Sequence, residues 1–214
     1  MELPHQRCFY VRGFSLLELL IVMGIVGFLS VLVMPRVGGI MQGSSLSQSG
    51  LLIEDNLKFA NQYARSHQCV VEVRFYQYKD SSISSSVGTF NAFQLLEMND
   101  SGTYKALSSV VHMSRSNVIM ADATYSPLLS GSPITPATGS PSIPGVGLNY
   151  TYERFSFLPN GQTDLLYTNP KGLQQASTQV YFISVAGYPT ASQPANFYTI
   201  AVDPVNSKIT SYRP

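Results

Sequence analysis

Hydrophobic residues change their spacing twice along this chain of 214 residues. Between positions 14 and 34 most residues are apolar, and Glu18 carries the one charge. As a helix these 21 residues would be roughly 31 Å long, which matches a bilayer core of about 30 Å. The pattern therefore predicts a membrane-spanning helix over 14–34.

A second helical pattern, with a single apolar face, begins near Leu46. Its apolar positions recur every three or four residues, as in an amphipathic helix that packs on its own domain: Leu46, Gly50, Ile53, Leu57, Ala60 and Ala64. The opposite face would carry Glu54, Asp55, Lys58, Asn61, Gln62 and Arg65. Pro35 removes a helix hydrogen bond, so we expect a kink there and a pliable, glycine-containing segment over 35–45. Residues 35–67 would thus be a flexible segment followed by an amphipathic helix, in one long, interrupted helix.

After His67 the pattern changes to a period of two. Apolar Val71, Val73 and Phe75 alternate with Glu72, Arg74 and Tyr76, which predicts a half-buried strand. Further strands are predicted over 93–97, 105–113, 117–120, 152–157, 178–185, 196–202 and 208–212. The sequence therefore predicts an α+β fold, in which a long N-terminal helix packs on an antiparallel β-rich domain over 68–214.

Residues 121–149 interrupt this strand pattern. They are rich in Ser, Pro, Gly and Thr, and the prolines and glycines of 139–147 make regular structure unfavourable. Two interpretations stay open for this loop: an exposed, variable connection, or a contact surface for a partner, since loops often carry recognition.

The apolar segment fits neither a secretory signal peptide nor an ordinary anchor. A signal peptide has an apolar region of about 7–15 residues followed by a cleavage site between small residues, whereas 14–34 is longer and runs into Pro35. An ordinary anchor leaves Glu18 unexplained, because a charge inside a transmembrane helix costs about 2.5–3.5 kcal/mol on insertion scales. We therefore expect Glu18 to serve a partner.

The sequence Arg12-Gly13-Phe14-Ser15-Leu16-Leu17-Glu18 resembles the type III signal of type IV pilins and type II secretion pseudopilins. The resemblance implies a leader peptide over 1–13, cleavage by prepilin peptidase between Gly13 and Phe14, and N-methylation of Phe14. It also implies that Glu18 pairs with the N-terminal amine of a neighbouring subunit, and recognition during assembly stays open as an alternative role. The resemblance places Pro35 where many family helices carry a proline. A glycine before the cut suits this processing, because a residue without a side chain lets a peptidase approach its carbonyl.

Two further stretches resemble narrower groups. The passage 46–74, in which helix runs into strand, and the sequence Phe157-Leu158-Pro159-Asn160-Gly161 resemble the minor pseudopilin H and FimT-like subgroup. The stretch 194–214 resembles a pilin-like family called Verru_Chthon cassette protein D, whose role is undefined.

Charge is sparse and balanced, with 13 Lys+Arg against 12 Asp+Glu. Removal of 1–13 would take away two arginines and one glutamate, which leaves 11 basic and 11 acidic side chains. A zero balance offers little attraction for phosphates, so nucleic acid is an unfavoured partner. A local basic patch of Lys58, Arg65, Arg74 and Lys79 would be needed for binding DNA.

The sequence lacks the common catalytic and metal-binding motifs. His67 is expected to cap its helix, and His112 to be structural. Asn99, Asp100 and Asp122 are oxygen ligands without EF-hand spacing, so no metal site is predicted. Cys8 would leave with the leader, and the remaining Cys69 would be a small buried residue without an internal disulfide.

These observations predict a structural subunit of a type IV pilus or type II secretion filament, not an enzyme, with no cofactor. It would cross the bacterial inner membrane once, with its C-terminal domain in the periplasm. The expected partners are prepilin peptidase/methyltransferase, other pilin or pseudopilin subunits and the membrane itself. The subgroup resemblance and the long loops favour a minor subunit. The alternatives are a DNA-binding minor pilin for uptake and an uncleaved, single-pass membrane-anchored protein.

Overall fold

The computed structural model describes residues 15–79, 89–99, 101–114, 116–129, 131–137, 140–165, 167–168, 174–175, 181–187 and 196–213. Within these ranges the side chains of 31–41, 167–168 and 174–175 are not described. The predicted leader 1–13 and Phe14 therefore lie outside the described residues, as does the serine-rich segment 80–88. The chain divides into two compact units, 1–41 and 42–214, and each is considered by itself.

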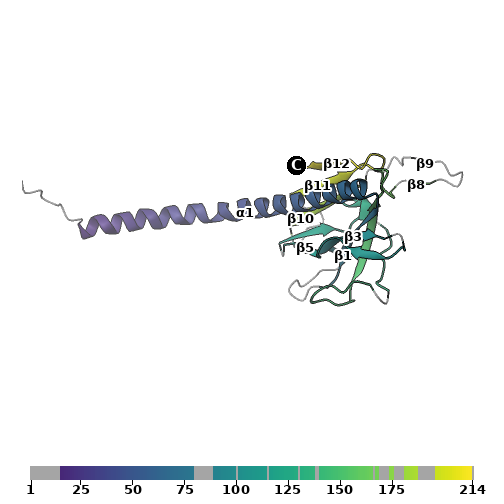
Figure 1. Cartoon of the computed structure of the whole chain (residues 1–214). Helices are drawn as coiled ribbons and strands as arrows, with labels where there is room; N and C mark the ends of the chain where they lie inside the picture. Colours follow the sequence, from purple (N-terminus) through teal and green to yellow (C-terminus); the bar gives the residue numbers. More distant parts are fainter. Residues whose placement is uncertain are drawn as a thin grey trace, which may run out of the picture. The chain divides into compact units, whose positions relative to one another are not determined.

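The N-terminal part of the described chain forms one α-helix, α1 (Leu16–His67) (Figure 1). Its 52 residues remain helical across Pro35 and the glycines after it, so the interruption expected over 35–45 is absent from the backbone. A proline removes only one donor from the ladder of helix hydrogen bonds, and the bonds around it can persist. The kink at Pro35, and the melting of 35–45 in a filament, stay predictions.

Two antiparallel sheets form the body of the second unit. Sheet A has the order β4 (Tyr104–Ala106), β3 (Ala92–Met98), β1 (Val70–Gln77) and β7 (Thr151–Phe157), and β5 (Val111–His112) also pairs with β3. Sheet B has the order β12 (Ile209–Tyr212), β11 (Phe197–Val202), β10 (Tyr181–Gly187), β6 (Asn117–Met120) and β2 (Thr89–Phe90). A short ribbon joins β8 (Tyr167–Thr168) to β9 (Gln174–Gln175). The predicted α+β fold, with a helix on antiparallel strands, is confirmed.

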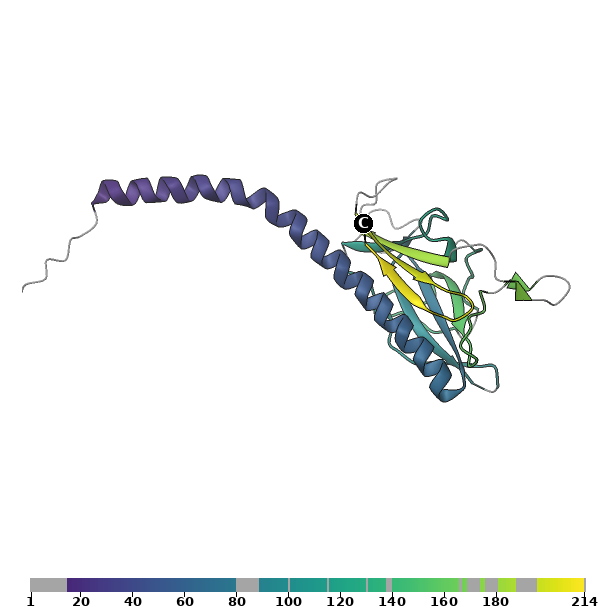
Figure 2. The ribbon, with the colours of Figure 1, turned by 90° about the horizontal axis from the view of Figure 1, so that it is seen from above.

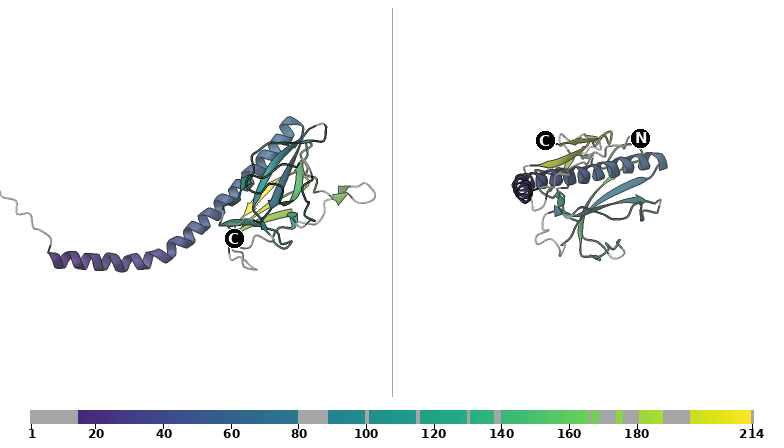
Figure 3. Two further views of the ribbon diagram at one scale, coloured as in Figure 1. Left: turned by 90° about the horizontal axis from the view of Figure 1, so that it is seen from below. Right: turned by 90° about the vertical axis from the view of Figure 1, so that its left-hand side faces the viewer.

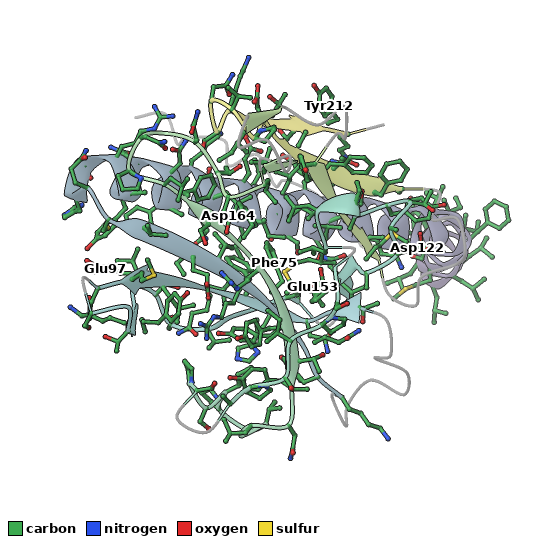
Figure 4. The ribbon with its side chains drawn as sticks, turned by 90° about the vertical axis from the view of Figure 1, so that its right-hand side faces the viewer. Phe75, Glu97, Asp122, Glu153, Asp164 and Tyr212 are labelled. Carbon is green, nitrogen blue, oxygen red and sulfur yellow. The ribbon has the colours of Figure 1, made fainter. Side chains whose placement is uncertain are left out.

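The main core lies where both sheets meet the C-terminal half of α1. In the right-hand view of Figure 3, this part of the helix lies between the yellow strands of sheet B and the teal strands of sheet A. Phe75 of β1, which stacks on Phe155 of β7, occupies the middle of the domain (Figure 4). The core therefore joins helix, sheet A and sheet B into one body.

Strand β1 departs from its predicted character. It is the central strand of sheet A, and its polar positions Glu72, Arg74 and Tyr76 are buried together with its apolar ones. The strand is therefore covered on both faces, not half-buried. The strand predicted over 105–113 is also two separate strands, β4 and β5, because residues 107–110 leave the ladder.

The described part of 121–149 is more structured than its composition indicates. It contains a 3-10 helix, η1 (Pro127–Leu129), with two buried leucines. Ile134 forms an antiparallel bridge to Tyr152 of β7, and Ile143 bridges Gly147. A second apolar cluster forms under this segment and includes Tyr76, Tyr78, Ala92, Ile143, Tyr150 and Tyr152. The segment thus covers part of the face of sheet A that lies away from the main core.

Candidate functional site: the N-terminal helix and its seat on the β-domain

The N-terminal part of α1 exposes every side chain that the structure describes between 15 and 30. Its large apolar residues range in exposure from 49% at Val22 to 85% at Leu16. Gly24 and Gly27 have no atom within 4 Å of the position that a Cβ would occupy. A soluble helix hides one apolar stripe and shows a polar face to water, whereas this segment is apolar all round. It therefore has the character of a surface that meets lipid or other proteins.

Glu18 is the one charged residue within 15–30, and it lies in the first turn of α1. The first turn begins at Ser15, whose carbonyl oxygen accepts bonds from the backbone N–H groups of Glu18 and Leu19, at 3.0 and 3.1 Å. A carboxylate in this turn interacts favourably with the positive end of the helix dipole. No ion pair to Glu18 is present among the described side chains, so its carboxylate can take a partner from outside.

Within the described ranges, we find no helix with the length and apolar content that a membrane crossing requires. The membrane-spanning segment predicted over 14–34 stays a prediction.

The C-terminal half of α1 packs on the β-domain of the same chain, and we call this interface the seat. All six positions of the predicted apolar stripe are buried, which confirms the stripe. Gly50 faces β11 so closely that a Cβ there would lie 2.3 Å from the ring of Tyr198. Figure 2 shows β11 and β12 alongside this part of the helix. Gly50 is therefore part of the stripe because only a residue without a side chain fits under the tyrosine.

Glu54 belongs to this seat rather than to the solvent face predicted from the sequence. It is 7% exposed and accepts a hydrogen bond from the Tyr198 hydroxyl at 2.8 Å. Lys58, one turn later, donates to its other oxygen at 2.6 Å. Burial alone would raise the pKa of Glu54, but the hydrogen bonds from Lys58 and Tyr198 outweigh it and lower the pKa. A charged carboxylate therefore joins the helix to sheet B.

Two arginines fasten the ends of the seat. Arg65 donates to the carbonyl oxygens of Gly161 and Asn206, at 3.2 and 2.9 Å. Gly161 has a φ of 83°, and a Cβ on it would lie 2.9 Å from the Arg65 guanidinium. At the other end, Arg213 donates to the Gly43 carbonyl at 3.2 Å. The turn at Pro159-Asn160-Gly161 thus forms a contact for the last turns of α1.

The other residues singled out from the sequence do not form a site. The ring of His67 stacks on Tyr63 at 3.9 Å, in the last turn of the helix. His112 contacts the Tyr78 hydroxyl at 2.8 Å. Cys69 is partly buried and free, and burial raises the pKa of its thiol. No cluster of metal-ligating side chains occurs in the described part of the chain.

The four basic residues that a DNA-binding patch would need lie in different parts of the domain. Lys58 and Arg65 line a shallow groove of about 430 Å³ together with Lys208, but Lys58 is paired with Glu54. Arg74 is buried in sheet A, and Lys79 lies at the end of β1 beside a different groove. The four residues therefore do not form one surface.

Sequence reasoning missed a buried charge cluster in sheet A. Glu72 of β1 pairs with Arg74 of the same strand and with Arg154 of β7. It also missed Glu153, which burial gives a pKa of about 7 and whose one described hydrogen-bond donor is the Gly131 backbone N–H, at 3.1 Å. Glu153 and Asp164 are labelled in Figure 4. An alternating strand pattern gives no signal for either site, because the covering segments come from elsewhere in the chain.

Comparison with known proteins bears on the N-terminal segment. Residues 9–34 match the family model described as the prokaryotic N-terminal methylation motif. The chain carries a prepilin-type methylation motif. This match confirms the resemblance to type IV pilins and pseudopilins, and it includes Gly13, Phe14 and Glu18.

Solved structures with a similar fold include two of the minor pseudopilin EpsH from the type II secretion system of Vibrio cholerae. One is 8% identical with a TM-score of 0.43, and the match covers 79% of this chain and 98% of that one. The other is 9% identical with a TM-score of 0.44, and the match covers 80% and 96%. No curated protein sequence matches the chain.

Proposed function

We propose that this pilin-type protein is a structural subunit of a filament of the type IV pilus or type II secretion class. The observation that supports the proposal is the N-terminal part of α1. An apolar, exposed helix segment with a single carboxylate in its first turn lies within the residues 9–34 that match a methylation motif. Cleavage between Gly13 and Phe14 would leave that helix at the very N-terminus of the mature subunit.

In this proposal the exposed helix has two successive environments. It first lies in the bacterial inner membrane, with the C-terminal domain in the periplasm, because the basic leader favours the cytoplasmic side. It then joins the apolar helices of other pilin or pseudopilin subunits, while the β-domains stay outside. The subunit performs no chemistry of its own, and a prepilin peptidase/methyltransferase processes it. The long segment 121–149 supports the role of a minor subunit.

Glu18 would set the position of each subunit in the filament. The N-methylated amine of Phe14 on a neighbouring subunit is the charge that best complements it. A buried ion pair of this kind adds specificity, whereas loss of one partner leaves an uncompensated charge that costs about 3–5 kcal/mol. A subunit shifted out of register would leave both charges unpaired, so the pair favours a single stagger.

N-terminal mass analysis of the protein extracted from membranes tests the proposal. We expect a chain that begins with monomethylated Phe14 and lacks residues 1–13. A Gly13→Leu variant should retain Met1, because a bulky side chain hinders access to the scissile carbonyl. A wild-type chain that keeps an intact Met1 terminus would identify an uncleaved anchored protein and contradict the proposal.

A further inference from the structure

The most unusual chemistry outside the helix lies on the outer face of sheet A, which is the face of β1 that carries Glu72, Arg74 and Tyr76. Arg74 lies directly opposite Arg154 of β7, and Glu72 lies opposite Ser156. The side chains of Glu72 and Arg74 are 1% and 6% exposed, whereas that of Arg154 is 42% exposed. Two guanidinium groups and one carboxylate therefore share a site that opens to solvent on the β7 side.

Both oxygens of Glu72, the one carboxylate among these three residues, accept hydrogen bonds. Glu72 accepts a hydrogen bond from Nε of Arg74 through one oxygen, and one from Nη1 of Arg154 at 2.8 Å through the other. The nearby carboxylate of Asp164 accepts the backbone N–H of Ser156 at 2.7 Å. Glu72, Arg74 and Arg154 by themselves carry two positive charges and one negative charge, and Asp164 is a further acidic group that interacts with Arg154.

The terminal nitrogens of Arg74 are the unused part of the site. Its guanidinium carbon lies 4.7 Å from the ring centroids of both Tyr104 and Tyr152. These tyrosines belong to β4 and β7, on opposite sides of β1. Among the described groups, none accepts a hydrogen bond from Nη1 or Nη2 of Arg74, although the side chain is more than nine-tenths buried.

These nitrogens are not sealed inside the protein. Every fully buried side-chain nitrogen or oxygen of the described residues has a hydrogen-bond partner. Since Nη1 and Nη2 of Arg74 have none, they must reach solvent. The site is therefore a guanidinium edge without an acceptor, flanked by the rings of Tyr104 and Tyr152. Tyr104 is 39% exposed, so this side of the group lies at the protein surface.

We infer that this edge of Arg74, between the rings of Tyr104 and Tyr152, binds a carboxylate. A guanidinium edge recognises a carboxylate through two parallel N–H···O bonds in one plane, and the rings that flank Arg74 favour a flat ligand over a bulky one. A tetrahedral phosphate would direct oxygens out of that plane towards the rings. Arg154 is positioned to add a further charged hydrogen bond from its free nitrogens. The bound carboxylate would neutralise the excess positive charge of Glu72, Arg74 and Arg154.

Two sources supply this chemistry, namely a free organic acid and an acidic side chain of another protein. Titration of the full chain in detergent micelles, with arginine labelled by 15N, distinguishes them through the Nε–H signals of Arg74 and Arg154. The probes are sodium succinate, the capped peptide Gly-Asp-Gly, its Gly-Asn-Gly counterpart, inorganic phosphate and sodium chloride. A saturable shift with succinate alone identifies a free acid, and tighter binding of the Asp peptide identifies a protein partner.

Three variants test whether a carboxylate binds at Arg74 and Arg154. Arg154→Gln should weaken carboxylate binding about tenfold, as expected for loss of a charged hydrogen bond. Lys105→Gln removes the same charge from the exposed strand β4, on the other face of sheet A, and should leave the affinity unchanged. Arg74→Lys keeps the charge but loses the planar edge, so it should weaken binding, and a thermal melt verifies that the variant is folded.

Four outcomes would overturn the inference. They are the absence of a saturable shift, an equal response to chloride, tighter binding of phosphate, and equal losses in Arg154→Gln and Lys105→Gln.

Discussion

The two halves of α1 share one backbone geometry and differ in where their apolar side chains go. Between 46 and 64 the six positions of the stripe are buried against sheets A and B, while Leu51, Leu52 and Phe59 outside the stripe are exposed. Between 16 and 29 they occupy the whole circumference of the helix, and all are exposed. A stripe can be satisfied by a single domain, whereas an all-round apolar surface needs neighbours on every side. The same helix thus packs on its own domain at one end and leaves an apolar surface exposed at the other.

The two glutamates of α1 repeat this contrast. Glu54 is buried and held by Tyr198 and Lys58 of the same chain. Glu18 is exposed, without an ion pair among the described residues. Burial of a carboxylate requires compensation, and the domain supplies it for Glu54 alone. Compensation for Glu18 in an apolar environment would have to come from another molecule.

Truncation of one leucine in each half should give the largest difference. Leu57→Ala removes a fully buried side chain from the core and should lower the free energy of unfolding by about 2–5 kcal/mol. Leu20→Ala, in the exposed half, should change it by less than about 0.5 kcal/mol. Denaturant unfolding in micelles, followed by the near-ultraviolet signal of the tyrosines, measures both. A comparable loss in Leu20→Ala would mean that the N-terminal half packs on its own domain.

The glutamates allow a second comparison of the same kind. Glu54→Ala leaves the buried Tyr198 hydroxyl without its acceptor, so it should lower the free energy of unfolding by about 1–3 kcal/mol. Glu54→Gln keeps an acceptor and should cost less. Glu18→Ala should leave the unfolding curve unchanged and act only on incorporation into filaments. If Glu18→Ala destabilised the isolated subunit, the carboxylate would have a role within its own chain.

Replacement of a glycine by alanine should have a smaller effect, unfavourable in the C-terminal half of α1 and favourable in the N-terminal half. Gly50→Ala places a Cβ against the ring of Tyr198, and overpacking of this kind costs about 1–3 kcal/mol. Part of that loss is offset, because alanine favours a helix by about 1 kcal/mol. Gly24→Ala meets no atom within 4 Å and should only raise the helix content. Thermal melts of the domain and the circular-dichroism helix signal report the two effects separately.

A further comparison concerns the pH dependence of the domain. Glu153 has its pKa raised from 4.5 to about 7 by burial, so the folded state holds a proton that the unfolded state releases. The stability contributed by this proton is present at low pH and is lost as the pH rises from about 4.5 towards 7, by at most about 1.4 kcal/mol per pH unit. Glu54 acts in the opposite sense, because its lowered pKa contributes stability that is lost on acidification.

Glu153→Gln separates the two contributions. The amide oxygen still accepts the N–H of Gly131, but the group no longer titrates. We expect the fall in melting temperature between pH 5 and 7 to become shallower in this variant. An identical pH profile in wild type and Glu153→Gln would show that Glu153 is ionised in the folded domain at pH 5. Either way, the N-terminal half of the helix should not respond, since the groups concerned lie in the β-domain.

The sequence predicted what periodicity alone can encode. The apolar stripe of α1 was predicted correctly to the residue, because it depends on a repeat of about 3.6 residues within one element. The bounds of strand β6 were also predicted correctly. Glu54 was wrongly predicted to lie on the solvent face of the helix, because Tyr198, which contacts it, lies 144 positions away in the sequence. β1 was predicted to be half-buried, because an alternating pattern does not reveal that Ile143 and Tyr150 pack with Tyr76 on the polar face.

Photo-crosslinking in membranes tests the central claim most directly. A photoreactive residue replaces Leu20 in the exposed half of α1, and a second variant carries it at Gln62 on the solvent side of the seated half. Position 20 should give abundant adducts with other pilin-type subunits, dependent on Glu18, and position 62 should give few. Adducts from position 20 that contain only lipid, on a chain that retains Met1, would contradict the assignment of a filament subunit.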